Sequence, residues 1–406
     1  MKNFIVSFLF CFLICSCSTE SEKVEINEKG VKNKLTLMVY MAADNDLESY
    51  ALANLRAMEQ ADYDGVKVLV LLDRAEGYDE TEGNWTDTRL FEVCHADGSD
   101  SSIKSRRLNC PPLGLSASSN TELDMANPSV LKGFIDFSKA SYEAEKYALI
   151  MWGHGNGWRA VSIDDKSLSF MSVYSLGQVL HDQELCVIGF DTCFGGVIEN
   201  VYELKDCSEY TVACPGVTPN TGWNYKSFFE ALSGEAENIT SKSIAQAMAE
   251  SAPVNTSIFE NQKMNEVMAG FEDFCKTLSE SIKNAADRNL LFDTLFSSKS
   301  YSYSQYPCDM YLDIGGLADL YSSDSDTRIS QSAVKLKSLL PETGGLGVHF
   351  IPLTAAHTAA TSHSSDYIKN QNLTDQCAFI KESQWWAATY EGKSASLLDK
   401  LFYSGL

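Results

Sequence analysis

A histidine and a cysteine each lie in a glycine-rich segment that follows a run of apolar residues. The two segments are Trp152–Trp158, with the sequence WGHGNGW, and Gly189–Gly196, with the sequence GFDTCFGG. Glycines around His154 leave its imidazole accessible and let a substrate backbone come close. Histidine is the usual general base near neutral pH, and a thiolate is a strong nucleophile. The pair therefore predicts acyl transfer, with Cys193 as nucleophile and His154 as base. The alternative for His154 taken alone is a turn-capping role.

Apolar runs and amphipathic segments alternate along the N-terminal half of the chain. Strands are expected at Leu35–Met41, Val66–Leu72, Tyr147–Trp152 and Leu185–Phe190, and helices at Leu47–Gln60, Pro128–Ala140, Ser175–Asp182 and Val197–Leu204. This alternation predicts an α/β fold with a mostly parallel sheet covered by helices on both faces. Ligands of such sheets bind beyond the carboxyl ends of the strands. His154 and Cys193 each follow one of these strands, so we expect them to meet at that edge.

The junction between the fourth strand and the next helix carries two further expectations. A helix N-terminus lowers the pKa of a nearby thiol, so the helix after Cys193 is expected to activate it. The backbone N–H groups of Gly155 and Cys193 are candidates for an oxyanion hole. No third partner for the histidine and cysteine is evident in the sequence.

The C-terminal part of the chain differs in character. Helices are expected at Ser241–Glu250, Asn265–Ala286, Leu291–Phe296, Ile314–Tyr321 and Ile329–Leu340, with one more strand at Gly347–Pro352. We therefore divide the chain into an α/β core at residues 34–240 and a mostly helical part at 241–406 that packs on the core.

The first 33 residues have the pattern of an exported lipoprotein. The apolar run Phe4–Ile14 is long enough for a signal peptide and too short to span a bilayer. A small residue and then Cys17 follow it, as in the lipobox of bacterial lipoproteins. Residues 1–17 are thus predicted to be a lipoprotein signal peptide ending in the lipidated Cys17, and 18–33 a flexible tether. The alternative is an ordinary signal peptide cut near Ser16 or Ser18. The protein is expected to be anchored to a bacterial membrane through its lipid only, and to face the periplasm or the exterior.

Charge and cysteine content narrow the function further. The formal net charge is −23, which repels nucleic-acid phosphates, so no nucleic-acid partner is expected. Nine cysteines follow Cys17, and an odd number in an exported protein leaves at least one thiol free. Most of them lie in apolar runs, which is typical of buried thiols. A disulfide between Cys94 and Cys110 is the alternative for that pair.

Three further segments, together with the two above, resemble the clostripain (C11) family of clan CD cysteine peptidases. They are Val39–Leu47, Tyr202–Leu204 and Gly222–Tyr225. The likeness covers residues 34–232 well and the remainder loosely. It implies a caspase-like αβα sandwich with a helical C-terminal extension. It also implies a His154–Cys193 dyad that hydrolyses peptide bonds in protein or peptide substrates.

The resemblance also implies a substrate specificity and a proteolytic processing step. Members of the family cleave after Arg or Lys. The aspartate two residues before the cysteine, here Asp191, recognises that basic side chain. A carboxylate pairs with a basic side chain, and with Arg it can do so bidentately; an N-cap role or a structural hydrogen-bond role is the alternative. Trp223 falls in a matching segment and is assigned to substrate binding. Relatives are often cut between the two motifs, where Lys166 and Arg159 are the candidate processing sites.

Calcium is the cofactor that the resemblance suggests, because some relatives need it as an activator. The acidic runs Asp44/Asp46/Glu48 and Asp164/Asp165 could supply ligands, but solvated acidic loops are the better interpretation of them. No EF-hand or zinc spacing occurs, so no residue is assigned to a metal. We expect a monomer, as one chain or as two chains after cleavage. One alternative is that the protein is a non-catalytic surface lipoprotein that uses the same fold as a binding module. Another alternative is that it is a caspase-like peptidase with another side-chain preference.

Overall fold

The computed structural model describes residues 32–61, 64–96, 102–233, 238–303, 306–350, 377–383, 385 and 397, without the side chains of 302–310. The predicted signal peptide, the lipidated Cys17 and the tether lie outside the described residues. Among the helices that are described, none is both long and apolar enough to cross a bilayer.

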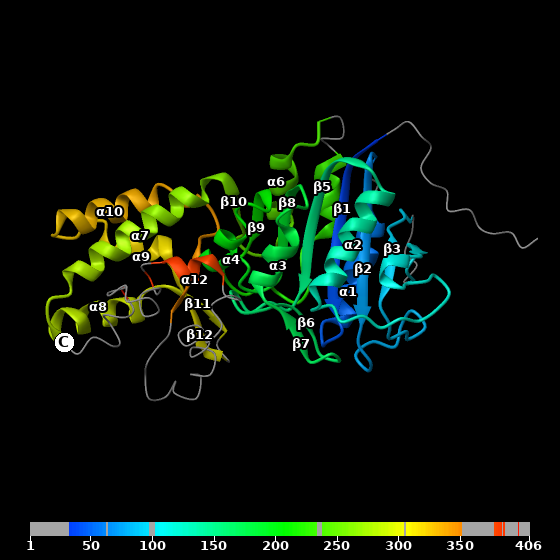
Figure 1. Ribbon diagram of the computed structural model, residues 1–406, viewed down its shortest axis with the longest axis horizontal. Coiled ribbons are helices and arrows are strands. Elements are labelled where there is room, and N and C mark those ends of the chain that lie inside the picture. Colours follow the sequence, from blue (N-terminus) through cyan, green and yellow to red (C-terminus); the bar gives the residue numbers. More distant parts are fainter. Residues whose placement is uncertain are drawn as a thin grey trace, which may run out of the picture. The chain divides into compact units, whose positions relative to one another are not determined.

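An eight-stranded sheet is the largest sheet of the described residues (Figure 1). Its order is β10 (Ser257–Glu260), β9 (Ser208–Ala213), β8 (Leu185–Asp191), β5 (Ala144–Gly153), β1 (Asn33–Ala43), β2 (Val66–Arg74), β3 (Arg89–Glu92) and β4 (Arg106–Leu108). The five strands from β9 to β2 are parallel. The short strands at the two edges are antiparallel to their neighbours. Parallel strands need crossover connections, and helices provide them here.

Helices cover both faces of this sheet. On one face, α2 (Pro128–Ser141), α3 (Val173–Leu180) and α4 (Ile198–Glu203) pack their apolar side chains against residues such as Met38. On the other face, α1 (Glu48–Glu59), α5 (Tyr225–Ser233) and α6 (Ser241–Ser251) do the same against residues such as Val39. Neighbouring strand residues point to opposite faces, which is why Met38 and Val39 belong to separate clusters. The predicted αβα sandwich is confirmed.

Helix starts follow the local sequence. Proline is the first residue of α2, and the Asn127 side chain accepts a hydrogen bond from the Ser129 backbone N–H. At the start of α6, the side chains of Thr240 and Ser243 each accept a hydrogen bond from the other residue's backbone N–H. These caps begin the helix that follows β4 and the second of the two helices between β9 and β10.

The C-terminal part contains α7 (Met264–Ser281), α8 (Ala285–Ser297), α9 (Ile314–Tyr321), α10 (Thr327–Lys337) and α12 (Ala378–Glu382). A second sheet joins β11 (Ser300–Tyr303), β12 (Tyr306–Asp313) and β13 (Gly347–Phe350). The expected helix through Ala286 instead ends at Ser281, because Ile282 is extended and Asn284 caps a new helix. Short edge strands such as β10 and β11 have too little periodicity to be predicted from sequence.

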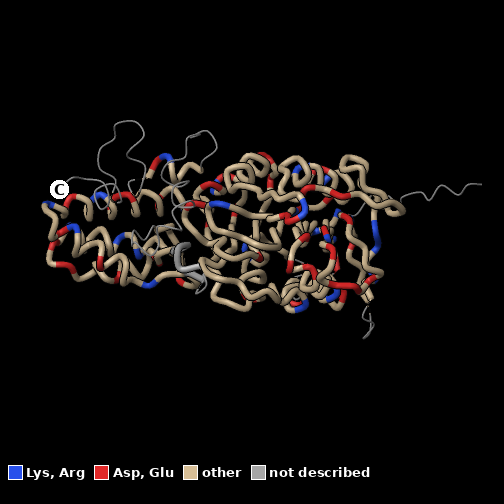
Figure 2. Tube along the Cα trace, turned by 90° about the horizontal axis from the view of Figure 1, so that it is seen from below, with Lys and Arg blue, Asp and Glu red and all other residues tan. Residues whose placement is uncertain are grey.

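The C-terminal sheet touches the cysteine segment directly. The backbone N–H of Gly347 donates to the carbonyl of Gly196 at 3.0 Å, and Val197 forms a parallel bridge with Gly347. The two-stranded sheet of β6 (Val161–Asp164) and β7 (Ser169–Met171) and the 3₁₀ helices at Pro111–Leu113 and Asn261–Lys263 complete the regular structure of the described residues. Asp and Glu are spread over the main sheet and the C-terminal helices alike (Figure 2).

Candidate active site

Strands β5 and β8 bring the two sequence motifs together. Trp152 is the register partner of Asp191 in this parallel pair, so His154 and Cys193 each lie two residues beyond a matched position. Both line one cleft at the carboxyl ends of the strands, with about 20 Å³ of space for water. The other residues that line it are Leu47, Trp152, Gly153, Asp191, Thr192, Thr218, Pro219, Asn220 and Gly222. The expected meeting of the two motifs at one sheet edge is therefore present in the fold.

Two neighbours position the imidazole of His154: the preceding residue Gly153 and the carboxylate of Asp46. Gly153 has a φ of +137°, and a Cβ there would lie 2.8 Å from the carbonyl oxygen of Ala42. The Nε2 atom of His154 lies 2.6 Å from Oδ1 of Asp46. A carboxylate can only accept, so Nε2 carries the proton and Nδ1 is left as the basic nitrogen.

Asp46 is the residue of this site that the sequence did not reveal. It lies on the exposed tip of the turn between β1 and α1, and the sequence indicates it only as one of the possible calcium ligands. The Asn45 side chain donates to the carbonyls of Ala42 at 3.1 Å and Ile163 at 3.0 Å, which fixes this turn. The available signal was topological, because β1 is the direct neighbour of β5 and both strands end at the same edge.

Cys193 lies in the loop between β8 and α4, five residues before the first residue of α4. Its side chain is buried, with the residue 7% exposed, and Sγ lies 3.6 Å from the carbonyl oxygen of Thr218. The thiol therefore lies in the expected strand-to-helix junction, before the start of α4 at Ile198, and its activation by that helix stays a prediction. Phe194, with a φ of +54°, turns the chain away from β8 before a helix can start.

Gly155 packs directly against the cysteine loop. A Cβ at this position would lie 2.5 Å from the carbonyl oxygen of Cys193 and 2.8 Å from Oγ1 of Thr192. Such approaches are too short for any side chain, so only glycine lets the histidine loop lie this close. The two proposed oxyanion donors, Gly155 and Cys193, are thus neighbours in space.

The C-terminal part supports this loop from behind. The rings of Phe194 and Tyr311 stack with centroids 5.1 Å apart, and Cys193, Phe194, Val197 and Tyr311 form one buried cluster. The hydroxyl of Tyr311 donates to the carbonyl of Asn156 at 3.4 Å. Residue 311 therefore contacts both the histidine loop and the cysteine loop.

Asp191 is a buried carboxyl group at the base of the cleft, 4% exposed. Its Oδ2 accepts hydrogen bonds from the backbone N–H of Trp223 at 3.0 Å and from the hydroxyl of Tyr225 at 2.9 Å. Its Oδ1 is buried without a hydrogen-bond partner among the described residues. Burial raises the pKa of Asp191 to about 7, against the lowering effect of those two hydrogen bonds.

Trp223 contributes to the site through its backbone. Its indole is buried in the core cluster on the α1, α5 and α6 face, and a Cβ on Gly189 would lie 2.9 Å from it. The neighbouring Gly222 lines the cleft, and a side chain there would lie 2.8 Å from Oδ2 of Asp191. The structure places Trp223 behind the carboxylate rather than along the cleft surface.

The two candidate processing residues lie in different surroundings. Lys166 lies in the exposed turn of a hairpin made by β6 (Val161–Asp164) and β7 (Ser169–Met171). Its ammonium forms an ion pair with Glu122 at 2.8 Å. Arg159 is half-buried in the histidine loop, with its guanidinium 5.7 Å from the ring centroid of Phe170.

The acidic residues identified as possible calcium ligands do not gather at one place in the structure, and most of them have other partners. Asp46 contacts His154, and Glu48 forms a fully buried ion pair with Arg74. Asp164 accepts backbone hydrogen bonds from Met125 and Ser167. Asp44 instead joins two residues that the sequence did not single out.

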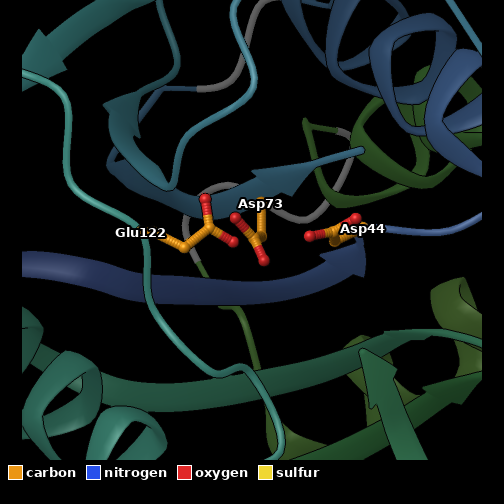
Figure 3. Close-up of side chains that lie close together, drawn as sticks. All are labelled: Asp44, Asp73 and Glu122. Atoms are coloured by element: carbon orange, nitrogen blue, oxygen red, sulfur yellow. The ribbon is translucent and has the colours of Figure 1, made fainter. Parts of the chain in front are cut away.

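Asp44, Asp73 and Glu122 form an acidic cluster (Figure 3). One carboxylate oxygen from each lies within 4.8 Å of the others. Burial, and then the charge of Asp164, raise the pKa of Asp44 to about 7. Burial also raises the pKa of Asp73 well above its ordinary value.

The described cysteines carry free thiols. They are Cys94, Cys110, Cys186, Cys193, Cys207, Cys214, Cys275 and Cys377. All except Cys94 are buried, as expected for thiols in apolar runs. The alternative of a disulfide between Cys94 and Cys110 is wrong.

A roomier hollow lies at the other end of the strands. It has a volume of about 1010 Å³ and is lined by residues of α2, of α3, of the start of β5 (including Tyr147) and of the turn before β8 (including Glu184). The amino ends of parallel strands are not where such sheets usually bind ligands. The small cleft at the carboxyl ends contains the histidine and the cysteine.

Fold and site together define a caspase-like cysteine peptidase architecture. The chain belongs to the clostripain family of cysteine peptidases, whose family model matches residues 39–385. Clostripain of Hathewaya histolytica is 30% identical over 246 residues. This match covers 52% of the present chain and 45% of clostripain, so the chain spans about half the length of that relative.

Two solved structures share the fold. One is an inactive zymogen C11 protease from Parabacteroides distasonis, with a TM-score of 0.60, 18% identity, and coverage of 83% of this chain and 97% of that one. The other is a secreted C11 cysteine protease from Bacteroides thetaiotaomicron in complex with an irreversible peptide inhibitor. Its TM-score is 0.56 and its identity 17%, and the match covers 82% of this chain and 96% of that one.

Proposed function

We propose that this protein is a cysteine endopeptidase in which Cys193 is the nucleophile, His154 the base and Asp46 the residue that orients the base. The observation that carries this proposal is the cleft at the ends of β5 and β8. It contains both His154 and Cys193, with Nε2 of the histidine held by a carboxylate. That arrangement of nucleophile, base and orienting group is the one that acyl transfer needs.

The reaction follows from the protonation pattern. Nδ1 of His154 takes the thiol proton, and the Cys193 thiolate attacks the carbonyl carbon of the scissile bond. The N–H groups of Gly155 and Cys193 stabilise the oxyanion, and the imidazolium then protonates the leaving amine. Water next attacks the thioester, His154 accepts its proton, and the carboxylic acid product leaves as the thiol is restored.

Asp191 is proposed to select Arg or Lys before the scissile bond. Its carboxyl group lies at the base of the cleft, and its Oδ1 is buried and unpartnered among the described residues. A buried polar atom without a partner is costly, so a cationic substrate side chain gains affinity by pairing with it. The cleft, at about 20 Å³, must widen around Asn220 and Gly222 to admit such a side chain.

Self-processing is proposed at Lys166 rather than Arg159. Lys166 lies in an exposed four-residue turn, whereas Arg159 is half-buried beside the histidine. Cleavage needs an extended segment, and a hairpin turn can open without loss of core packing. The relative from Parabacteroides distasonis is named an inactive zymogen, which supports a maturation step in this chain too.

Export and anchoring complete the proposal. Residues 1–17 are proposed as the lipoprotein signal peptide, with Cys17 lipidated, and 18–33 as the tether. The division into a peptidase core at 34–240 and a C-terminal part at 241–406 remains a proposal, as does a monomer acting on protein or peptide substrates. A relative from Bacteroides thetaiotaomicron is named a secreted protease, which supports export.

The test uses short reporter peptides with Arg, Lys, Asp or Leu before the cleaved bond. The wild-type chain is expected to cleave the Arg and Lys peptides, and Cys193→Ala to cleave none. Cys275→Ala is the matched control, because Cys275 is a buried thiol in α7. Absence of thiol-dependent turnover would favour a binding module instead. Turnover without a preference for the Arg and Lys peptides would contradict only the proposed role of Asp191.

A further inference from the structure

Asn54 is a buried polar residue in the middle of α1, where asparagine is unfavourable unless its amide has partners. It is not among the residues that line the cleft. Its Oδ1 accepts a hydrogen bond from the indole N–H of Trp152 at 2.8 Å, and its Nδ2 donates to the backbone carbonyl of Thr221 at 2.9 Å. An indole N–H can only donate and a carbonyl can only accept, so the two bonds fix the orientation of the amide.

The carbonyl of Thr221 belongs to a tight turn in the wall of the cleft. The backbone N–H of Gly222 donates to the carbonyl of Pro219 at 2.9 Å, which closes a four-residue turn. Pro219, Asn220 and Gly222 all line the cleft. The carbonyl of the third residue in such a turn has no partner within the turn, and the amide of Asn54 supplies one.

The segment that contains this turn is attached to the site on both sides of it. Before the turn, Oγ1 of Thr218 donates to the carbonyl of Thr192, the residue before the proposed nucleophile, at 2.9 Å. After the turn, the backbone N–H of Trp223 donates to Oδ2 of Asp191 at 3.0 Å. The hydrogen bond from Asn54 lies between these two attachments and fixes the part of the segment that forms the wall.

Gly222 brings the amide and the carboxyl group to the same place. Its φ is +65°, and a Cβ there would lie 2.6 Å from Oδ1 of Asn54, 2.8 Å from Oδ2 of Asp191 and 3.2 Å from Nε1 of Trp152. The backbone of Gly222 is therefore packed between the amide that holds the turn and the carboxyl group beside it. A displacement of the turn changes the spacing between the wall and Asp191.

We propose that Asn54 is a positioning residue for substrate selection: it holds the turn beside Asp191 at the spacing that a guanidinium group needs. This inference rests on the proposed role of Asp191. The donors of a guanidinium are fixed in direction within a plane, so an Arg side chain depends on the exact position of the carboxyl group and the wall. The ammonium of Lys is a compact charge on a flexible stem and tolerates a displaced wall. Loss of the bond from Asn54 therefore weakens the recognition of Arg more than that of Lys.

The first test compares Arg and Lys reporter peptides with Asn54→Leu, which keeps the side-chain volume and removes both hydrogen bonds. We expect kcat/KM to fall at least about tenfold for the Arg peptide and less than about threefold for the Lys peptide, mainly through KM. Alkylation of Cys193 by iodoacetamide, a small uncharged reagent, is expected to keep its rate. Equal losses for the two peptides, or slower alkylation of Cys193, would show that Asn54 acts on the whole site and would overturn the inference.

Asn261→Leu is the matched control for a loss of stability. Asn261 is also buried, and its amide donates to the backbone carbonyls of Leu204 at 3.2 Å and Ser208 at 3.0 Å. Ser208 begins β9, at the end of the sheet opposite the cleft. Both variants should have a lower Tm than wild type, whereas only Asn54→Leu should change the Arg-to-Lys ratio of kcat/KM. If Asn54→Leu does not fold, Asn54→Ala, in which water can reach the freed carbonyl, is measured with the same expected ratio.

A binding measurement separates this inference from the proposed peptidase activity. Calorimetry on the Cys193→Ala chain, with short peptides that end in an Arg amide or a Lys amide, requires no turnover. Adding Asn54→Leu is expected to weaken binding of the Arg peptide at least about tenfold and that of the Lys peptide less. This difference in a chain whose wild type has no thiol-dependent turnover would refute the proposed hydrolysis alone. Equal weakening of both peptides, or no binding of either to the Cys193→Ala chain, would refute the role of Asn54.

Discussion

Nε2 of His154 and Oδ1 of Asp46 lie 2.6 Å apart, although 108 positions separate the two residues in the chain. The contact exists because β1 and β5 are neighbours in the sheet and both end at the same edge. It assigns the tautomer of the imidazole and leaves Nδ1 to act on the thiol. The exposed position of Asp46 limits its electrostatic strength, so its main effect is orientation.

Asp46→Asn is expected to lower kcat on an Arg reporter peptide by about ten- to a hundredfold, with KM nearly unchanged. An amide can present its N–H to Nε2 and stabilise the wrong tautomer, whereas the carboxylate cannot. Asp46→Glu should restore part of the rate. Asp165→Asn, in the nearby hairpin turn, is the control. Equal kcat values for Asp46→Asn and wild type would show that the contact has no role in turnover.

The second prediction concerns the specificity of Asp191. Asp191→Asn is expected to reduce kcat/KM for the Arg peptide by about a hundredfold while leaving a Leu peptide nearly unaffected, because a buried ion pair is broken. In the wild type, the Arg-to-Leu ratio of kcat/KM should rise as pH increases through about 7, where Asp191 ionises. The ratio cancels the titration of the histidine and cysteine. A ratio that is flat with pH would contradict this role.

The same carboxyl group predicts a pH effect on stability. Its folded-state pKa of about 7 lies above its ordinary value of 3.8, so the folded chain holds this proton more tightly than the unfolded chain. The resulting stability is full below about pH 4 and is lost as pH rises through about 7. Asp191→Asn should therefore have a higher Tm than wild type at pH 8 and no such advantage at pH 4. Thermal unfolding of both chains, with Asp182→Asn as control, checks the sign.

Much of the fold and part of the site follow from the sequence, for reasons visible in individual residues. His154 and Cys193 end long apolar strands, and the rule that parallel strands share a carboxyl edge is enough to bring them together. Asp46 could not be predicted, because chain order does not say that β1 lies beside β5. Tyr311 reaches the site from a second sheet with two short strands. The start of α4 at Ile198 lies within one residue of the expected Val197, because the apolar positions after the glycines have helical spacing.

Gly155→Ala is expected to lower activity strongly and stability moderately. The added Cβ would lie 2.5 Å from the carbonyl oxygen of Cys193, so the histidine and cysteine loops must separate. Overpacking of this kind costs about 1–3 kcal/mol. Gly315→Ala is the matched control, since a Cβ there meets only ordinary contacts at 3.5 Å. Kinetics and urea unfolding of both variants test this, and a fully active Gly155→Ala chain would refute the close packing of the two loops.

Tyr311 links the C-terminal part to catalysis. Its ring stacks on Phe194, and its hydroxyl lies over Gly157, where a Cβ would be only 1.9 Å away. Tyr311→Ala should destabilise the chain by about 3–5 kcal/mol and lower kcat in the fraction that remains folded, because the loop carrying Cys193 loses its support. Tyr311→Phe keeps the ring and loses only a long hydrogen bond of 3.4 Å, so it should retain most of the activity.

Tyr321→Ala separates a general loss of stability from an effect on the site. Tyr321 packs on Phe274 among the C-terminal helices, with centroids 5.9 Å apart, and is not one of the residues in the cluster around Cys193. Both alanine variants are measured below their unfolding temperatures, with the folded fraction taken from circular dichroism. If Tyr311→Ala and Tyr321→Ala have the same kcat per folded molecule, the C-terminal sheet stabilises the protein without positioning Cys193. A lower kcat for Tyr311→Ala alone is the expected result, since the Tyr311 ring stacks on Phe194, the residue next to the nucleophile.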